Sequence, residues 1–351
     1  MATVTEVQKG VRAASTEKTG AWAAFVGAVK QSRLPWLFIL PSTLVMAVVT
    51  LYPQALQVYM SFTNFDNRHF NPENSPDWVG LQNFEKILNN SIPISNYSFP
   101  RLLAFNIIWA ISNVAFHVVI GVGVAMLLNA KGLWLRRLYR AIFVLAWATP
   151  GYISALVWRS AFNQNYGAIN LLIGKFNEWF GLHISTSTRW LVDEVPPIDL
   201  PIFSILPYAF YAVFIANLWL GWPFMMIVAT GALQSIPKEL YEAADVDGAT
   251  KWRQFWSITV PLIRPAMVPA IMLGMIWTFN GFNVIYFITG GGPRRQTEIL
   301  VTQAYNLLQE TSIPGRYGMA AAFSLVVFVI LLFITLINNR ITKATESYDE
   351  A

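Results

Sequence analysis

The sequence predicts an all-α integral membrane protein with six transmembrane helices and both termini in the cytoplasm. Of its 351 residues, 55% are hydrophobic and only 12% are charged, against about 25% charged in a typical soluble domain. Long stretches carry no charge, and short basic segments flank them. Cysteine is absent, which excludes disulfides and thiolate metal sites.

Six apolar segments predict the six helices. A helix of about 20 residues crosses roughly 30 Å of hydrocarbon, and these segments are about that long or longer. The third is slightly short, and we expect it to extend back through Leu138 and Tyr139. The fourth is too long for one straight helix, so we expect its helix at about 208–233 and the preceding residues at the outer interface. The segments are 34–64, 102–130, 141–158, 200–237, 265–293 and 317–339.

The distribution of Lys and Arg predicts the orientation. Fifteen of the 24 basic residues lie in 1–34, 131–140, 234–264 and 340–351, although the alternating loops are longer. Basic loop residues favour the cytoplasmic side. The basic residues border apolar runs rather than forming one arm, which indicates a lipid bilayer and not nucleic acid as the partner.

This topology divides the chain into three regions. Residues 1–33 are expected to form a cytoplasmic tail or an interfacial helix. Residues 34–342 form the transmembrane domain, and residues 343–351 a cytoplasmic tail. The pattern describes a multi-pass protein with one membrane domain.

A charged segment, 235–261, interrupts the apolar sequence on the cytoplasmic side. Ser235 and Pro237 are typical of a helix start, Gly248 is a natural helix stop, and Pro261 is expected to begin the next span. Three aromatic side chains share one face of the second short helix: Trp252, Phe255 and Trp256. This helix–glycine–helix unit either folds back on its own bundle or docks a cytoplasmic partner.

Amide side chains inside apolar spans are costly unless they have partners. Asn217 lies in the fourth span, and Asn280 and Asn283 lie in the fifth. Each amide either makes an interhelical hydrogen bond or contacts a hydroxyl of a ligand. Pro223 is expected to kink the fourth helix near Asn217, and Gly221 is expected to allow a ligand to approach closely.

Aromatic residues near these amides offer flat faces to sugar C–H groups: Trp219, Trp222, Phe224 and Trp277. Spans four and five contain no ionised side chain, which favours a neutral cargo and opposes a proton-coupled or ion-coupled carrier. We expect His117 to be structural, Gly121 and Gly123 to allow close helix packing, and Pro150–Gly151 to kink the third span.

The cytoplasmic segment resembles the EAA loop of ABC importer permeases. Glu242-Ala243-Ala244 is followed after three residues by Gly248, and after nine more by Ile258-Thr259-Val260-Pro261. Only Val260 departs from the family pattern, which has Leu there. The stretches NLWLGWPFMM (217–226) and FNVIYFITGGGP (282–293) resemble the sugar-permease branch, the maltose and glycerol-3-phosphate type. The resemblance covers residues 34–342.

The resemblance implies the architecture of a type I ABC importer permease. The chain would pair with a second permease subunit, a cytoplasmic ATPase dimer and an extracytoplasmic sugar-binding protein. The implied ATPase-coupling residues are Glu242, Ala243, Ala244, Gly248, Ile258 and Pro261. The sequence has no G-x-x-x-x-G-K-[ST] motif, so ATP and Mg are expected on the partner ATPase, with no catalytic or metal site here.

The resemblance also implies substrate contacts, to which we add the span-five amide Asn280. Phe224 stands where maltose-type relatives have a tyrosine, and Thr278 and Gly281 stand where asparagines occur. These departures bear on which sugar is bound and not on where the site lies. The implied contacts are Asn217, Leu220, Gly221 and Phe224 in span four, and Trp277, Thr278 and Gly281 in span five.

The predicted function is therefore a membrane subunit of an ATP-driven, binding-protein-dependent importer of a neutral mono- or oligosaccharide in a bacterial or archaeal cytoplasmic (inner) membrane. A polyol or glycerol phosphate is an alternative cargo, although a phosphate would favour Arg or Lys near the cavity. A secondary carrier would show a membrane carboxylate. A membrane scaffold would use the cytoplasmic loop for docking only.

Overall fold

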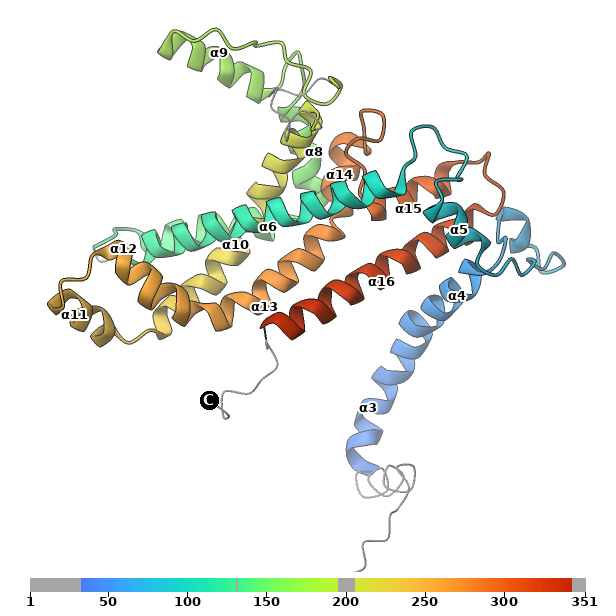
Figure 1. Ribbon diagram of the computed structural model, residues 1–351, viewed down its shortest axis with the longest axis horizontal. Coiled ribbons are helices and arrows are strands. Elements are labelled where there is room, and N and C mark those ends of the chain that lie inside the picture. Colours follow the sequence, from blue (N-terminus) through green and yellow to red (C-terminus); the bar gives the residue numbers. More distant parts are fainter. Residues whose placement is uncertain (1–32, 131, 195–205, 343–351) are drawn as a thin grey trace, which may run out of the picture. The chain divides into compact units, whose positions relative to one another are not determined.

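The computed structural model describes residues 33–130, 132–194 and 206–342 (Figure 1). It has two compact units, Met1–Gln57 and Val58–Ala351. The described residues are helical, with one isolated β-bridge between Thr63 and Trp78. The predictions for 1–32 and for the tail 343–351 lie outside the described residues.

The first span is a helix in three sections: α3 (Arg33–Met46), the π-helix η1 (Ala47–Leu51) and α4 (Tyr52–Ser61). Its apolar stretch, Leu37–Ser61, has 25 residues, which is enough to cross a bilayer. The helix corresponds to the first predicted span.

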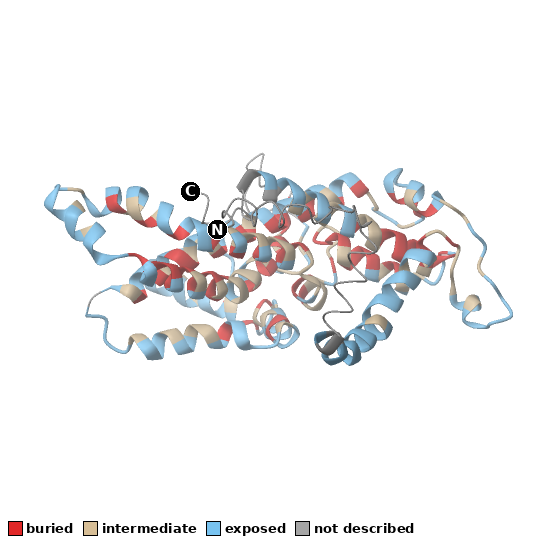
Figure 2. Ribbon diagram, turned by 90° about the horizontal axis from the view of Figure 1, so that it is seen from below, coloured by how far each residue is buried: buried red, intermediate tan, exposed pale blue. Residues whose placement is uncertain are grey.

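The second unit is built on four long helices: α6 (Phe99–Asn129), α10 (Tyr208–Ser235), α13 (Val260–Phe279) and α16 (Arg316–Thr342). Helix α6 packs along α10, and α13 packs against both. A Cβ on Gly121 would lie 2.6 Å from the Met225 Cβ, so glycine is what lets α6 and α10 approach this closely. Buried residues follow the inner faces of the long helices (Figure 2).

The helix predicted at about 208–233 is confirmed by α10, but the segment predicted as the third span is more sharply bent than expected. It consists of α7 (Arg136–Ala148) and α8 (Gly151–Ala161), which meet at 93°. Pro150 has no N–H, so the Ala146 carbonyl loses its helical partner, and the preceding Thr149 is extended. The described residues thus contain five long apolar helices, or six if this bent pair is one span.

The fifth span differs from the prediction at both ends. It was wrong to begin the span at Pro261, because α12 (Lys251–Gln254) continues through the π-helix η3 (Phe255–Thr259) directly into α13. It was also wrong to expect one helix to 293. Asn280 and Gly281 leave helical geometry, and a separate helix, α14 (Phe282–Thr289), follows.

Shorter helices connect these spans. Asn170 and Asn177 on α9 (Ala168–Phe180) bind the chain that follows this helix. Their amides donate to the carbonyls of Thr188 (3.0 Å) and Ile184 (2.7 Å). The segment after the third span is therefore an ordered hairpin. The connecting helices are η2 (Asn67–Phe70), α5 (Gln82–Leu88), α9 (Ala168–Phe180), α11 (Lys238–Val246) and α15 (Leu300–Gln309).

Candidate functional site

A hollow of about 210 Å³ lies between α7, α10 and α13. Its wall includes the break between α7 and α8, because Thr149 and Gly151 line it. Six of the eight predicted substrate residues share this hollow: Asn217, Leu220, Gly221, Phe224, Trp277 and Thr278.

Three aromatic rings lie next to one another along the wall of this hollow. The ring centroids of Trp147 and Phe224 are 6.1 Å apart with nearly parallel planes, and those of Phe224 and Trp277 are 5.1 Å apart. Trp147 and Trp277 are 44% and 48% exposed, so both side chains are accessible. Sequence reasoning missed Trp147, and its place shortly before the Pro150–Gly151 helix breaker was the signal that could have found it.

Two of the four aromatic residues predicted to face a sugar lie elsewhere. Trp222 is buried and its ring centroid lies 5.1 Å from that of Phe143. Trp219 contacts Trp158, at 6.4 Å between centroids. Burial contradicts the predicted role of Trp222, whereas the role of Trp219, which is 49% exposed, stays a prediction.

Asn217 joins two helices and also lines the hollow. Its Nδ2 donates to the Asn113 Oδ1 at 2.8 Å, and its backbone carbonyl lies 3.0 Å from the His117 Nε2. A Cβ on Gly221 would clash with the His117 ring. His117 thus fills the side of Gly221 on which a Cβ would lie, although Gly221 also lines the hollow.

Helix α6 holds the site together through one buried polar face. The Asn106 Nδ2 donates to the Phe279 carbonyl (3.2 Å), and its Oδ1 accepts from the Leu300 N–H (2.8 Å). The Trp109 indole donates to the Thr278 carbonyl at 3.1 Å. These bonds satisfy carbonyls at the end of α13. Residues 106, 109, 113 and 117 share one helix face, a pattern that becomes visible only when Trp109 is counted.

A second hollow of about 400 Å³ adjoins the first and contains the other two predicted residues, Asn280 and Gly281. Both hollows share Gly151 and Trp277. Asn283 also lines the second hollow. The helix break in span three and the helix break in span five therefore face the same space.

The linings of both hollows contain no Asp, Glu, Lys or Arg. The described residues also contain no group of three metal-ligating side chains of the His, Cys, Asp and Glu types. Aromatic faces and amides are suited to an uncharged, hydroxyl-bearing molecule.

The segment 235–261 folds as the expected helix–glycine–helix unit. Gly248 has φ +72°, and a Cβ at this position would meet nothing within 4 Å, so only the backbone favours glycine there. Asp245 accepts from the Gln254 Nε2 and pairs with Lys251 (2.7 Å). These contacts fix α11 against α12 across the turn.

The coupling residues implied by the resemblance lie on both sides of this turn. Glu242 and Ala243 are exposed, Ala244 is half-buried, and Pro261 is exposed. Ile258 packs against the core formed by α6, α10 and α13.

The aromatic face of α12 and η3 is divided. Phe255 packs on the bundle core, whereas Trp252 and Trp256 are 70% and 53% exposed, and Val246 at the tip of α11 is 89% exposed. Phe255 thus packs back on the helical bundle, whereas Trp252 and Trp256 do not.

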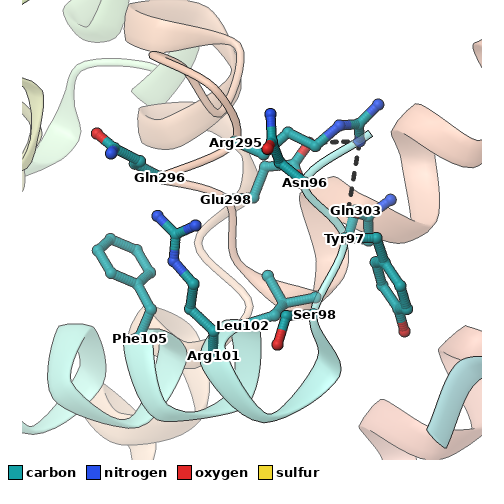
Figure 3. A pocket seen from close by; sticks show the side chains of 10 residues that line it. All are labelled: Asn96, Tyr97, Ser98, Arg101, Leu102, Phe105, Arg295, Gln296, Glu298 and Gln303. Carbon is teal, nitrogen blue, oxygen red and sulfur yellow. Dashed lines mark hydrogen bonds and ion pairs between the residues drawn. The ribbon is translucent and has the colours of Figure 1, made fainter. Parts of the chain in front are cut away.

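A polar cluster that the sequence did not reveal follows α14 (Figure 3). Arg295 pairs with the buried Glu298 (3.1 Å) and with Glu310 (2.8 Å). Burial raises the pKa of the Glu298 carboxyl above its usual range even though Arg295 opposes the shift. The adjoining pocket, which Arg101 also lines, has about 20 Å³, room for about one water. The ion pairs of this cluster hold the loop after α14 in place, and the adjoining pocket is too small for a sugar.

Comparisons with known proteins show the family to which the chain belongs. Residues 117–346 match the family described as the inner membrane component of binding-protein-dependent transport systems. The chain is 32% identical over 331 residues to the maltodextrin transport system permease protein MalC of Streptococcus pneumoniae, covering 92% of this chain and 72% of that protein.

Two further matches are of the same kind. The galactooligosaccharides transport system permease protein GanP of Bacillus subtilis is 33% identical, covering 88% of this chain and 70% of that protein. Among solved structures, a bacterial ABC transporter involved in alginate import superposes with a TM-score of 0.68 at 20% identity, over 92% of this chain and all of that chain. That likeness concerns the fold.

Proposed function

The chain belongs to the family of inner-membrane components of binding-protein-dependent transport systems, and from that premise we propose that it forms the path of an ATP-driven importer of a neutral carbohydrate. The observation that carries the proposal is the uncharged hollow with its wall of Trp147, Phe224 and Trp277. Aromatic faces suit the C–H faces of a sugar ring, and side-chain amides suit its hydroxyls.

The names of the relatives support the cargo class, since they mention maltodextrin and galactooligosaccharides. A glycerol phosphate cargo is disfavoured, because neither hollow is lined by Arg or Lys and phosphate recognition relies on such groups. An ion-coupled carrier would place a carboxylate in the path, and the described linings contain none. A polyol fits the same chemistry and is the second candidate.

Uptake by the reconstituted importer tests this function. The complex would be purified with its ATPase and its binding protein, placed in liposomes, and supplied with labelled α-glucans, β-galactans and polyols of one to three units. We expect uptake of at least one carbohydrate series, dependent on ATP and on the binding protein. Uptake of polyols alone would favour the second candidate, and ATP-independent uptake would contradict the proposal.

The segment from α11 to η3 is the proposed docking element for a separate ATPase dimer, which would carry ATP and Mg. Four large apolar side chains are exposed on this segment: Leu240, Val246, Trp252 and Trp256. Exposed aromatic side chains on a rigid support are typical anchors of protein–protein interfaces. Glu242, exposed on α11, adds a charge for the ATPase to recognise.

A pair of glycine variants tests the docking element. Gly248 and Gly132 both have positive φ and open space around a Cβ, so substitution strains both backbones similarly. Gly248→Asp or Glu242→Lys should abolish the stimulation of ATP hydrolysis by substrate-loaded binding protein, whereas Gly132→Asp should retain it. Native stimulation in Gly248→Asp would remove the case for this segment.

The proposed location is a bacterial or archaeal cytoplasmic membrane, with both termini and α11 in the cytoplasm and α9 outside. The partners are a second permease subunit, the ATPase dimer and an extracytoplasmic binding protein. Because the chain has no cysteine, Val246→Cys should react with an impermeant thiol reagent only from the cytoplasmic side, and Ser185→Cys only from outside. Reaction of both from one side would contradict the six-span topology.

A further inference from the structure

The two hollows meet where two transmembrane helices are broken. Span three breaks at Thr149–Pro150 and span five breaks at Asn280–Gly281. Non-helical backbone at membrane depth is tolerated where it is buried in protein or lines a polar cavity. Gly151, directly after the first break, lines both hollows, and Trp277, just before the second, also lines both.

The polar side chains of the two hollows differ in availability. In the first hollow, the Asn217 amide already donates to Asn113. In the second hollow, neither the Asn280 nor the Asn283 side chain makes a hydrogen bond to another described residue. Unpartnered amides beside an aromatic ring are open to the hydroxyls of a bound molecule.

The volumes of the two hollows also favour one shared ligand. The first hollow, at about 210 Å³, falls below the roughly 300–1,000 Å³ of typical small-molecule sites. The adjoining hollow of about 400 Å³ brings the combined space within that range. One ligand that extends through both would use the aromatic wall of the first and the amides of the second.

We propose that the two hollows are consecutive subsites for one oligosaccharide, and that Gly151 keeps the passage between them open and thereby sets the length of chain that is carried. This inference rests on the proposed carbohydrate function and goes further in naming the second subsite. Asn283 binds hydroxyls of the distal unit. Trp277 contacts both units.

Gly151 is a suitable point of intervention. A Cβ there would lie 3.7 Å from the Asn283 Nδ2 and 4.0 Å from its Cβ, which is ordinary van der Waals contact. Gly151→Ala therefore fits without displacing its neighbours, whereas the longer side chain of Gly151→Leu extends into the passage. Gly123 in α6 is the matched control, because it is exposed and has nothing within 4 Å of a Cβ.

The experiment measures uptake of one-, two- and three-unit members of the α-glucan and β-galactan series by the reconstituted importer. In the series that the wild type carries, Gly151→Leu should lower the ratio of three-unit to one-unit uptake by at least about tenfold, and Gly151→Ala by less. Gly123→Leu should leave the ratio as in the wild type. Asn283→Ala should raise the KM for the three-unit sugar about two- to tenfold, the loss of one hydrogen bond.

The outcomes separate the two claims. If Gly151→Leu and Asn283→Ala change uptake of every chain length equally, the hollows are not consecutive subsites, while the carbohydrate function stands. If the wild type carries neither series, the proposed function fails and this inference fails with it. Should Gly151→Leu not assemble with the ATPase, Gly151→Ala and Asn283→Ala decide the question by the same ratio.

Discussion

The polar face of α6 and the wall of the two hollows use similar residues in opposite ways. On α6, the amides of Asn106 and Asn113 are buried and hydrogen-bonded to neighbouring helices or backbone. Along the second hollow, Asn280 and Asn283 have solvent-accessible amides without a described partner. Paired amides hold the bundle together, and unpaired amides are left for a ligand.

Asn217 stands between these two groups and shows why residue type alone does not assign a role. Its Nδ2 binds Asn113, while the residue also lines the first hollow. The comparison therefore predicts loss of stability from changes on the α6 face and loss of transport affinity from changes on the wall.

The largest expected effect is the loss of Asn106. Asn106→Ala leaves the Phe279 carbonyl and the Leu300 N–H unpaired, and each buried unpaired group costs roughly 1–3 kcal/mol. The free energy of unfolding should fall by about 2–6 kcal/mol, measured as a lower Tm of the purified complex. Asn283→Ala is the control and should change Tm little. Equal Tm shifts in both variants would erase the distinction between the two groups of amides.

A crowding variant sharpens the same comparison. Gly221→Ala drives a Cβ into the His117 ring, and overpacking costs roughly 1–3 kcal/mol. Gly231→Ala in the same helix meets nothing within 4 Å, and its better helix propensity should leave stability unchanged or slightly higher. A stable Gly221→Ala protein with an altered sugar KM would return Gly221 to the ligand-facing group.

On the wall, Trp147 should affect affinity more than stability. Trp147→Leu keeps an apolar side chain but removes a ring face that lines the hollow. If a ring–sugar contact is worth as much as an aromatic pair, its loss costs roughly 0.5–1.5 kcal/mol of binding. The KM for the carried sugar should rise about two- to tenfold in liposome uptake. Trp219→Leu, outside both hollow linings, is the control. A larger rise for Trp219→Leu would place the aromatic path elsewhere.

The sequence predicts the long helices well and their breaks poorly, for physical reasons. An uncharged run with flanking polar residues determines where a helix such as α10 lies. A proline in such a run predicts a kink, but the 93° angle between α7 and α8 depends on packing. Helix α13 ends before Asn280–Gly281, and side chains of α6, 169 and 173 positions away in the sequence, donate hydrogen bonds to its last carbonyls. No local pattern identifies these distant partners.

The candidate site shows the same division. Spacing within spans four and five identifies residues that the structure gathers in adjoining hollows. Trp147 comes from a different span, and only the fold brings it beside Phe224. The pairing of Asn113 with Asn217 joins residues 104 positions apart, so no local pattern separates the structural role from the ligand-binding role.

The smallest expected effect concerns the cluster of Arg295, Glu298 and Glu310 after α14, whose polar groups are paired with one another. Burial raises the pKa of Glu298, so the folded state holds its proton more tightly than the unfolded state. The resulting stability is fully present below the ordinary glutamate pKa, about 4.3, and is lost as pH rises through the raised pKa. The Tm of the wild type relative to Glu298→Gln should therefore fall as the pH is raised from about 4.5 to about 8. A relative Tm that rises with pH would contradict this sign.

The most direct test of the central claim, that the hollow between α7, α10 and α13 binds the carbohydrate, is protection of a cysteine placed in it. The chain has no native cysteine. Leu220→Cys lies in the hollow, and Ser235→Cys lies at the exposed end of the same helix. In the assembled importer, a saturating concentration of the transported sugar should slow thiol labelling of Leu220→Cys severalfold. The labelling rate of Ser235→Cys should stay unchanged. Equal labelling rates of Leu220→Cys with and without the sugar would contradict the claim.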